Sequence, residues 1–415
     1  MSEHGRPGGF RRGARRVAVG AGLVVGAVVL VLAVLLTLTE GPFGSARGPV
    51  VATLSVAEAL SGDRLEGFAR AEAPRAFVFP RDHGPHPEFR AEWWYWTGNL
   101  RTAGGRHLGF QLTFFRRALT PDTPARDSDW GASQAYLAHL AVTDSRGGRF
   151  RFATRTSRGA LGLAGAQAEP FRVFVEDWRA EADSRAERAT NGFAIHLRGE
   201  DEDVALDLHL ESAKPPVLQG ERGLSRKGPE PGNASYYYSL TRMPARGTIR
   251  LGSERLEVEG LAWMDREWST AAVGRDLAGW DWFALQLEDG RELMYYRLRR
   301  RDGTADPFSA GVVVDARGGT RVLERDGVRL EATGAWRSRR SGVEYPAGWR
   351  LTDTAGGLEL TVTPRLADQE LDVSPRYWEG AVEVRGTDGG RPVAGHGYVE
   401  LVGYGEAGRL PETKR

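Results

Sequence analysis

The chain of 415 residues contains no cysteine. This absence excludes disulfide bonds, zinc sites built on thiolates and a cysteine nucleophile. It also excludes anchoring through a lipid on an N-terminal cysteine. Any attachment to a membrane must therefore come from a stretch of the polypeptide itself.

The chain also lacks an excess of charge of either sign. Its 56 basic and 55 acidic residues give a net charge of +1, so no global electrostatic attraction favours nucleic acid, and we expect no nucleic-acid partner. Helical signals are few. The 54 glycines and many short runs rich in Val, Thr, Leu, Phe and Tyr, separated by Gly-Gly and Asp-Gly, predict an antiparallel all-β protein.

One long hydrophobic run stands near the N-terminus. Residues 17–38 contain no charged residue, and roughly 20 residues at about 1.5 Å rise can cross the ~30 Å hydrocarbon core of a bilayer. Arg11, Arg12, Arg15 and Arg16 stand just before the run. This positive charge predicts that residues 1–16 are cytoplasmic. We expect a transmembrane helix that anchors the protein in the inner membrane of the cell envelope, with the main body extracytoplasmic. The alternative is a cleaved signal sequence and a secreted protein.

The residues after this run predict a linker and then β-structure. Residues 39–74 combine a Gly/Pro-rich linker with spacing that suits a short helix around residues 52–70. A hairpin is predicted from Trp94–Leu100 and Leu108–Phe114, because Gly104-Gly105 lies between two β-type runs. By the same reasoning, Phe193–Leu197 and Val204–Leu210 predict another hairpin.

The second half of the chain repeats the order of the first. Trp94-x-Trp96 with Leu100 recurs as Trp280-x-Trp282 with Leu287. Val258-x-Gly260-x-Ala262-Trp263-x-Asp265 recurs as Val393-x-Gly395-x-Gly397-Tyr398-x-Glu400, and two further matches lie between these in the same order. We therefore predict two related β-barrel or β-sandwich domains, at residues 75–265 and 266–415. The alternative is a chance likeness among hairpins.

Two stretches interleave aromatic and charged residues. Gly260–Leu287 contains four tryptophans among several carboxylates, and Phe79–Leu112 has a similar composition. Large apolar faces beside carboxyl groups are typical of a ligand site, since an apolar wall shifts the pKa of an acid. A β-sheet core with charges facing water is the alternative interpretation.

At these residues the chain resembles the AttH-like family, which is related to carotenoid 1,2-hydratases. The resemblance covers residues 75–405. It rests on FPRDHGPHPEFRAEWWYWTGNL at Phe79–Leu100, GFQLTFFRR at Gly109–Arg117, AWMDREWS at Ala262–Ser269 and GWDWFALQLEDGRELMYYRLR at Gly279–Arg299. It implies two tandem lipocalin-like β-barrel halves. Family members resemble either enzymes that add water to the terminal double bond of acyclic carotenoids, or envelope proteins labelled as secreted hydrolases and associated with an ABC-type export system.

Alkene hydration requires a carboxyl group that stays protonated near neutral pH, aromatic faces that stabilise a carbocation, and a positioned water. Asp265 fits the acid role, and by resemblance it occupies the position of the hydratases' catalytic aspartate. His83, His86 and Glu92 complete the predicted catalytic set, as a general base or as residues that orient the substrate. Metal ligation and loop packing are the alternatives for the two histidines, and we expect no metal and no cofactor.

We expect the substrate to contact nine further residues: Trp93, Trp94, Tyr95, Trp263, Glu267, Trp268, Trp280, Asp281 and Trp282. The two stretches should then converge on one cleft. The function predicted is hydratase-like or hydrolase-like addition of water to an apolar isoprenoid or lipid-like molecule. The alternative is a non-catalytic lipid-binding partner of an ABC-type transporter. A serine hydrolase has no motif in its support, because Ser133, Ser235 and Ser269 lack a Gly-x-Ser-x-Gly context.

Overall fold

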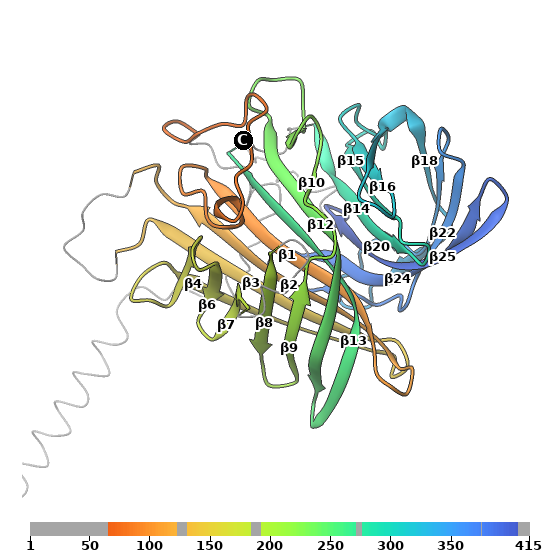
Figure 1. The fold of residues 1–415 in the computed structure, drawn as a ribbon, viewed down its shortest axis with the longest axis horizontal. Helices are drawn as coiled ribbons and strands as arrows, with labels where there is room; N and C mark the ends of the chain where they lie inside the picture. The colour runs from red at the N-terminus through yellow and green to blue at the C-terminus, as the bar shows by residue number, and fades with distance from the viewer. Residues whose placement is uncertain (1–64, 123–130, 184–191, 271–275, 375, 406–415) are drawn as a thin grey trace, which may run out of the picture. The chain divides into compact units, whose positions relative to one another are not determined.

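The computed structural model describes residues 65–122, 131–183, 192–270, 276–374 and 376–405 (Figure 1). The apolar run at residues 17–38 lies outside these ranges. Across the described ranges, no helix is both long and apolar enough to cross a membrane. Residues 65–70, the end of the predicted short helix, form no helix.

The first of two large sheets contains thirteen antiparallel strands, in the order β4-β3-β2-β1-β13-β12-β9-β8-β7-β6-β5, with β10 and β11 paired to β12. Their bounds are β1 (Ala91–Arg101), β2 (His107–Ala118), β3 (Gln134–Asp144), β4 (Arg149–Arg158), β5 (Ala164–Gln167), β6 (Arg172–Val175), β7 (Trp178–Ala182), β8 (Ala194–Glu200), β9 (Val204–Glu211), β10 (Val217–Leu218), β11 (Leu224–Arg226), β12 (Ala234–Leu251) and β13 (Glu254–Ser269). A short 3-10 helix, η1 (Arg81–His83), precedes them. Both predicted hairpins are present, as β1–β2 and β8–β9.

The second sheet has ten strands, in the order β17-β16-β15-β14-β25-β24-β22-β21-β18, with β23 paired to β24. The bounds are β14 (Leu277–Leu287), β15 (Glu292–Arg300), β16 (Ala310–Val314), β17 (Thr320–Glu324), β18 (Val328–Ala332), β21 (Trp349–Asp353), β22 (Leu358–Pro364), β23 (Glu370–Leu371), β24 (Tyr377–Asp388) and β25 (Arg391–Val402). A two-stranded sheet, β19 (Ala335–Arg337) with β20 (Glu344–Pro346), and a 3-10 helix, η3 (Arg325–Gly327), complete the described elements.

The two sheets share one topology. In each, the first four strands form a meander and the last strand returns to pair with the first, β13 with β1 and β25 with β14. This confirms two lipocalin-like halves, which the repeat and the resemblance predicted. The change of sheet falls between Ser269 and Leu277, a few residues after the boundary we had drawn at 265/266.

The tryptophan match within the repeat was one residue out of register. Leu100 pairs with Gly260, and Leu287 pairs with Gly395, so these positions correspond in the two halves. Counting back from them, Trp282 corresponds to Tyr95 and not to Trp96. Because strand side chains alternate between faces, this slip moves a residue to the opposite side of the sheet. Trp96 accordingly lies in the core of the first barrel, whereas Trp282 lies between the sheets.

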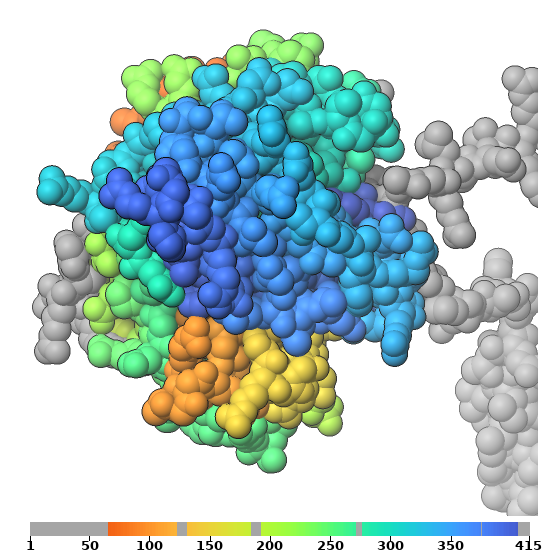
Figure 2. Space-filling view, turned by 90° about the vertical axis from the view of Figure 1, so that its right-hand side faces the viewer, coloured from red at the N-terminus to blue at the C-terminus, as the bar shows by residue number. Residues whose placement is uncertain are grey.

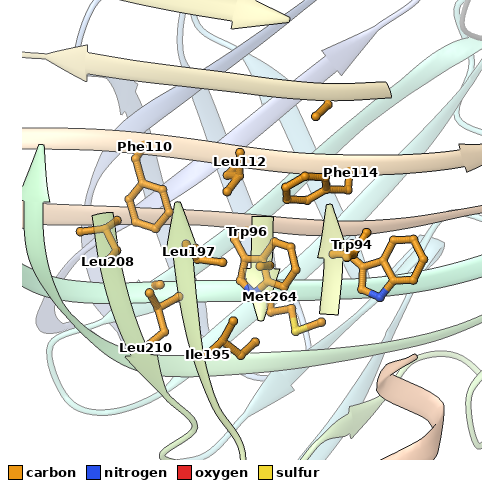
Figure 3. Close-up of a cluster of buried hydrophobic side chains, with 14 of the residues drawn as sticks. Trp94, Trp96, Phe110, Leu112, Phe114, Ile195, Leu197, Leu208, Leu210 and Met264 are labelled. Carbon is orange, nitrogen blue, oxygen red and sulfur yellow. The ribbon is translucent and has the colours of Figure 1, made fainter. Parts of the chain in front are cut away.

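Alternating apolar residues fill the interior of the first barrel. In β9 the residues with even numbers from Val204 to Leu210 are buried, and the residues between them are partly exposed. Figure 3 shows Leu208 beside Phe110, and Leu197 and Met264 beside Trp96. The interior is therefore a packed core, and a ligand must bind elsewhere.

The two sheets pack against each other through the outer faces of their central strands. Tyr95, Tyr237 and Trp263 of the first sheet share a buried cluster with Trp282 and Tyr398 of the second. Close approach is possible because Gly109 on β2 lacks a side chain; a Cβ there would lie 2.5 Å from that of Ala381 on β24. Figure 2 shows the surface of the second half of the chain, in cyan to blue, with orange and yellow segments of the first half beside it.

The packed interior predicts a large effect of core truncation. Trp96 has no exposed surface, so Trp96→Ala should lower the free energy of unfolding by about 3–5 kcal/mol through lost burial and a new cavity. Urea denaturation followed by tryptophan fluorescence measures the change. Val322→Ala, at a 58% exposed position, is the control and should stay within about 0.5 kcal/mol of wild type. Equal effects of the two changes would contradict a packed barrel.

Candidate active site between the sheets

A cavity of about 370 Å³ lies between the two sheets. Its volume is at the lower end of the range for small-molecule sites, about 300–1,000 Å³. Both halves of the repeat supply its walls. The residues that matter most for chemistry are Trp93, Tyr95, Lys227, Tyr237, Asp265, Glu267, Trp280, Trp282, Tyr377, Glu379 and Glu400.

Asp265 lines this cavity from the C-terminal part of β13. Its Oδ2 accepts a hydrogen bond from the hydroxyl of Tyr237 at 2.5 Å, and its Oδ1 accepts from Ser239 at 2.5 Å and from Nε1 of Trp263 at 2.8 Å. Burial raises the pKa of Asp265 to about 7, and the charge of Glu267 adds to this, while the three hydrogen bonds act in the opposite direction. Asp265 can therefore both give and take a proton near neutral pH.

Two glutamates of the second sheet, Glu400 and Glu379, also line the cavity. Glu400 corresponds to Asp265 in the repeat, since Asp265 pairs with Tyr95 and Glu400 pairs with Trp282. Burial raises the pKa of Glu400 to about 8, against a hydrogen bond from Nε1 of Trp280 at 3.1 Å. Burial, together with the charge of Glu400, also raises the pKa of Glu379 well above its usual value. Around one cavity, the buried Asp265 and Glu379 and the partly exposed Glu400 thus all hold their protons more tightly than ordinary carboxyl groups do.

Aromatic rings form much of the remaining wall. The rings of Tyr95 and Trp282 meet edge to face with centroids 5.2 Å apart. Nε1 of Trp282 donates to the hydroxyl of Tyr237 at 3.2 Å, so indole, phenol and Asp265 form a chain of hydrogen bonds. Lys227 also lines the cavity, and its Nζ lies 3.5 Å from Glu267 and 4.0 Å from the ring centre of Tyr296.

Glu92 belongs to a different, ionic cluster. It is fully buried and accepts hydrogen bonds from Arg116 and Arg266, which are also buried. Burial alone would raise the pKa of Glu92, but the two guanidinium groups outweigh it and hold the pKa well below its usual range. Glu92 is therefore a permanent carboxylate that balances two cations, and it cannot serve as a general acid near neutral pH.

His83 and His86 pack against the same ionic cluster. Burial lowers the pKa of His83 to about 3, and the charge of Arg266 adds to this; its ring stacks on Phe193 with centroids 3.6 Å apart. The ring of His86 stacks on Trp268 at 3.7 Å, and its Nδ1 lies 3.1 Å from Arg266. A metal ion does not fit beside Glu92, because the two guanidinium groups already occupy the carboxylate and would repel a cation.

Three of the remaining predicted residues, Trp94, Trp268 and Asp281, lie on the sides of the sheets that face away from the cavity. Trp94 and Trp268 lie in the core of the first barrel. Asp281 accepts hydrogen bonds from Arg297, Arg299 and Tyr404, at 2.5, 2.9 and 2.9 Å respectively for the closest atoms. His83, His86, Trp94, Trp263, Trp268 and Asp281 do not line the cavity, although Trp263 lies between the sheets and donates a hydrogen bond to Asp265. Asp265, Glu267, Trp93, Tyr95, Trp280 and Trp282 do line it, as does part of Glu92.

Sequence reasoning missed several residues of the cavity. Glu400 was already visible as the repeat partner of Asp265, and the repeat was the signal that could have identified it. Tyr237, in a run of three tyrosines, alternates to the cavity side, while Tyr236 and Tyr238 pack in the barrel core. Glu379 and Lys227 carried no sequence signal, because only tertiary folding brings them to the cavity that Asp265 lines.

Comparison with known proteins identifies the family. The family model described as AttH-like matches residues 70–404. The chain belongs to the AttH-like family. A solved structure of an AttH protein from Nitrosomonas europaea is 38% identical to it; the alignment covers 81% of this chain and 100% of that one, with a TM-score of 0.71.

A more distant structural relative of this AttH-like protein is kievitone hydratase from Nectria haematococca. It is 16% identical, the alignment covers 81% of this chain and 95% of that one, and the TM-score is 0.61. A likeness at this identity shows a shared fold. Comparison with curated protein sequences gives no match.

The ionic cluster of the AttH-like protein predicts a structural role for Glu92. Replacing Glu92 by Gln leaves two buried guanidinium groups without their counter-charge, so we expect the free energy of unfolding to fall by about 3–5 kcal/mol. Denaturant unfolding measures the change. The matched control is Glu88→Gln, at a nearby exposed position, which should have little effect. A loss below about 1 kcal/mol for Glu92→Gln would show that the cluster is not held by this carboxylate.

The raised pKa of Asp265 predicts a pH dependence of stability. The folded chain holds this proton more tightly than the unfolded chain, whose aspartate has a pKa near 3.8. The contribution of Asp265 is therefore fully present below about pH 4 and is lost as the pH rises through about 7. Asparagine does not titrate, so the stability of Asp265→Asn relative to wild type should increase by on the order of 2 kcal/mol between about pH 5 and pH 8.

Urea denaturation at several pH values measures this difference. Asp203→Asn, at an exposed position in the turn between β8 and β9, is the control and should show no such trend. A flat difference for Asp265→Asn would mean that Asp265 has an ordinary acidity in the folded protein.

Proposed function

We propose that this AttH-like protein is a hydratase-like or hydrolase-like enzyme that adds water to an apolar small molecule bound between its two sheets, with Asp265 as the proton donor. The observation that carries the proposal is the combination of a buried carboxyl group with a pKa of about 7 and an aromatic cavity in front of it. A protein that only carries a lipid needs an apolar cavity but gains nothing from carboxyl groups poised to exchange protons.

The proposed reaction needs one carboxyl group, which donates a proton and later takes one back. Protonated Asp265 gives its proton to one carbon of a double bond, and a carbocation forms at the other carbon. A water molecule then attacks the cation, and the proton it loses returns to the carboxylate of Asp265. A group with a pKa near 7 performs both transfers at similar cost, which is why burial of this acid matters.

The aromatic wall supports the cationic intermediate of this reaction. A positive charge is attracted to the face of an aromatic ring within about 6 Å, and most strongly to that of tryptophan. Trp280, Trp282 and Tyr95 line the cavity and can provide such faces. Protonated Glu400 and Glu379 are neutral, so they can hydrogen-bond the attacking water without competing for the cation.

The cavity also bears on the class of substrate. Leu137, Leu277 and Leu298 are part of its lining, which favours an isoprenoid or other lipid-like group over a sugar or a nucleotide. A volume of about 370 Å³ suits a small molecule, or the end of a longer chain whose remainder lies outside. The distant relative carries the name of a hydratase, and at 16% identity its likeness supports the fold on which this proposal rests.

The proposal for the location of the protein rests on the sequence of residues 17–38 alone. An uncleaved anchor there would hold the cavity outside the cytoplasmic membrane, where lipid-like molecules from the envelope could reach it. The same location suits the second interpretation, a lipid-binding component of an export system, which becomes an outcome of the test below.

The test starts from molecules that co-purify with the full-length protein, identified by mass spectrometry. Each is incubated with the protein in water enriched in oxygen-18, so that hydration or hydrolysis adds labelled oxygen to the product. We expect labelled product from wild type, and Asp265→Asn should lower kcat by about 10²–10⁴-fold, the usual contribution of a general acid or base. Asp203→Asn should keep the wild-type rate.

Two results would overturn the catalytic interpretation. One is that the Asp265→Asn variant folds and still converts the substrate at the wild-type rate. The other is equal binding of the same molecule by wild type and variant with no conversion by either, which would support the carrier interpretation instead.

A further inference from the structure

Three potential metal ligands share one face of the β8–β9 hairpin. His196 pairs directly with His209 across the two strands, and Asp207 lies two residues before His209. Ile195, Leu197, Leu208 and Leu210 point into the barrel (Figure 3), so the residues between them must point outward. Alternation thus places two imidazoles and one carboxylate together on the outer surface, away from the cavity between the sheets.

The side chains of this triad already lie within reach of one another. One candidate ligand atom from each of the three residues falls within 4.8 Å of the other two. Nε2 of His196 is 2.7 Å from Oδ1 of Asp207, and the two imidazole rings stack with centroids 4.1 Å apart. Zinc binds nitrogen and oxygen ligands at about 2.0–2.2 Å, so small side-chain rotations would bring the three atoms onto one ion.

A fourth residue orients one of the ligands. Oδ2 of Asp183, on the chain just after β7, lies 2.6 Å from Nδ1 of His209. A carboxylate only accepts hydrogen bonds, so it fixes the proton of a neutral His209 on Nδ1 and leaves the lone pair of Nε2 for a metal. Metal-binding histidines usually have such a carboxylate behind them, which fixes the ring and increases its basicity.

We propose that His196, Asp207 and His209 form a binding site for a divalent transition-metal ion of the zinc class. Two imidazoles and one carboxylate suit Zn²⁺, Ni²⁺ or Cu²⁺, and they leave one coordination position for water or an external ligand. The side chains are 21% exposed for His196, 39% for Asp207 and 31% for His209. An ion can therefore reach them from solvent. Arg198 lies 3.3 Å from Oδ2 of Asp207, so Oδ1 is the oxygen for the metal. Asp183 is a positioning residue in this site.

The first experiment is isothermal titration of the full-length, metal-free protein with ZnCl₂. We expect one equivalent to bind wild type, and the double variant His196→Gln/His209→Gln to lose this binding. His396→Gln removes a partly buried histidine outside the triad and should retain it. Asp183→Asn should weaken binding by about 10–100-fold, the usual cost of losing a carboxylate behind a metal-binding histidine.

A spectroscopic readout identifies the ligands without relying on affinity. Addition of CuSO₄ should give an electron paramagnetic resonance spectrum with hyperfine splitting from two imidazole nitrogens in wild type, and this splitting should be lost in the double variant. If the double variant does not fold, which its circular dichroism spectrum would reveal, Asp207→Asn takes its place and should weaken zinc binding. The proposal is overturned if wild type binds no zinc, or if the triad variants and wild type bind it equally.

Discussion

The alternation of side chains along β13 is the constraint on which both the stability and the chemistry of the molecule depend. Asp265 and Glu267 point to the cavity, while Arg266 and Trp268 point into the first barrel. One strand therefore supplies an acid to one face and the centre of a buried ionic cluster to the other. A shift of β13 by one residue would exchange these environments, and it would bury the arginine charge against the second sheet.

Desolvation acts in opposite directions on the two faces of this strand. On the barrel side, Glu92 stays ionised because Arg116 and Arg266 neutralise it. On the cavity side, Asp265 has hydroxyl and indole donors, and within the described part of the chain no arginine or lysine is bonded to it, so burial prevails and raises its pKa. The difference between a structural carboxylate and a candidate catalytic one thus comes from the nature of the partner, since both groups are buried.

The sequence predicted the fold better than the site. Alternating apolar residues, glycine-containing turns and the repeat are local signals, and they yielded the strands and their duplication correctly. The choice of face was harder, because Trp94 and Trp96 look the same in the sequence as Trp280 and Trp282, although the first pair fills a barrel and the second lines a cavity. Asp265 was predicted as the acid from its tryptophan neighbours and from the resemblance to the AttH-like family. Glu379 comes from the second sheet and Lys227 from the segment just after β11, and their places in the cavity wall depend on tertiary folding, which no local pattern records.

The duplicated halves do not present identical walls to the cavity. Pairing places Ser239 of one half in the position of Glu379 in the other, and Glu267 in the position of Val402. A cavity with true twofold symmetry would accept an elongated molecule in either direction. Here Glu267, whose carboxylate lies 3.5 Å from Lys227, lines the cavity from one half, and Val402 lines it at the corresponding position of the other half. Divergence after duplication has therefore made the wall asymmetric, so the two orientations of an elongated molecule would meet different side chains.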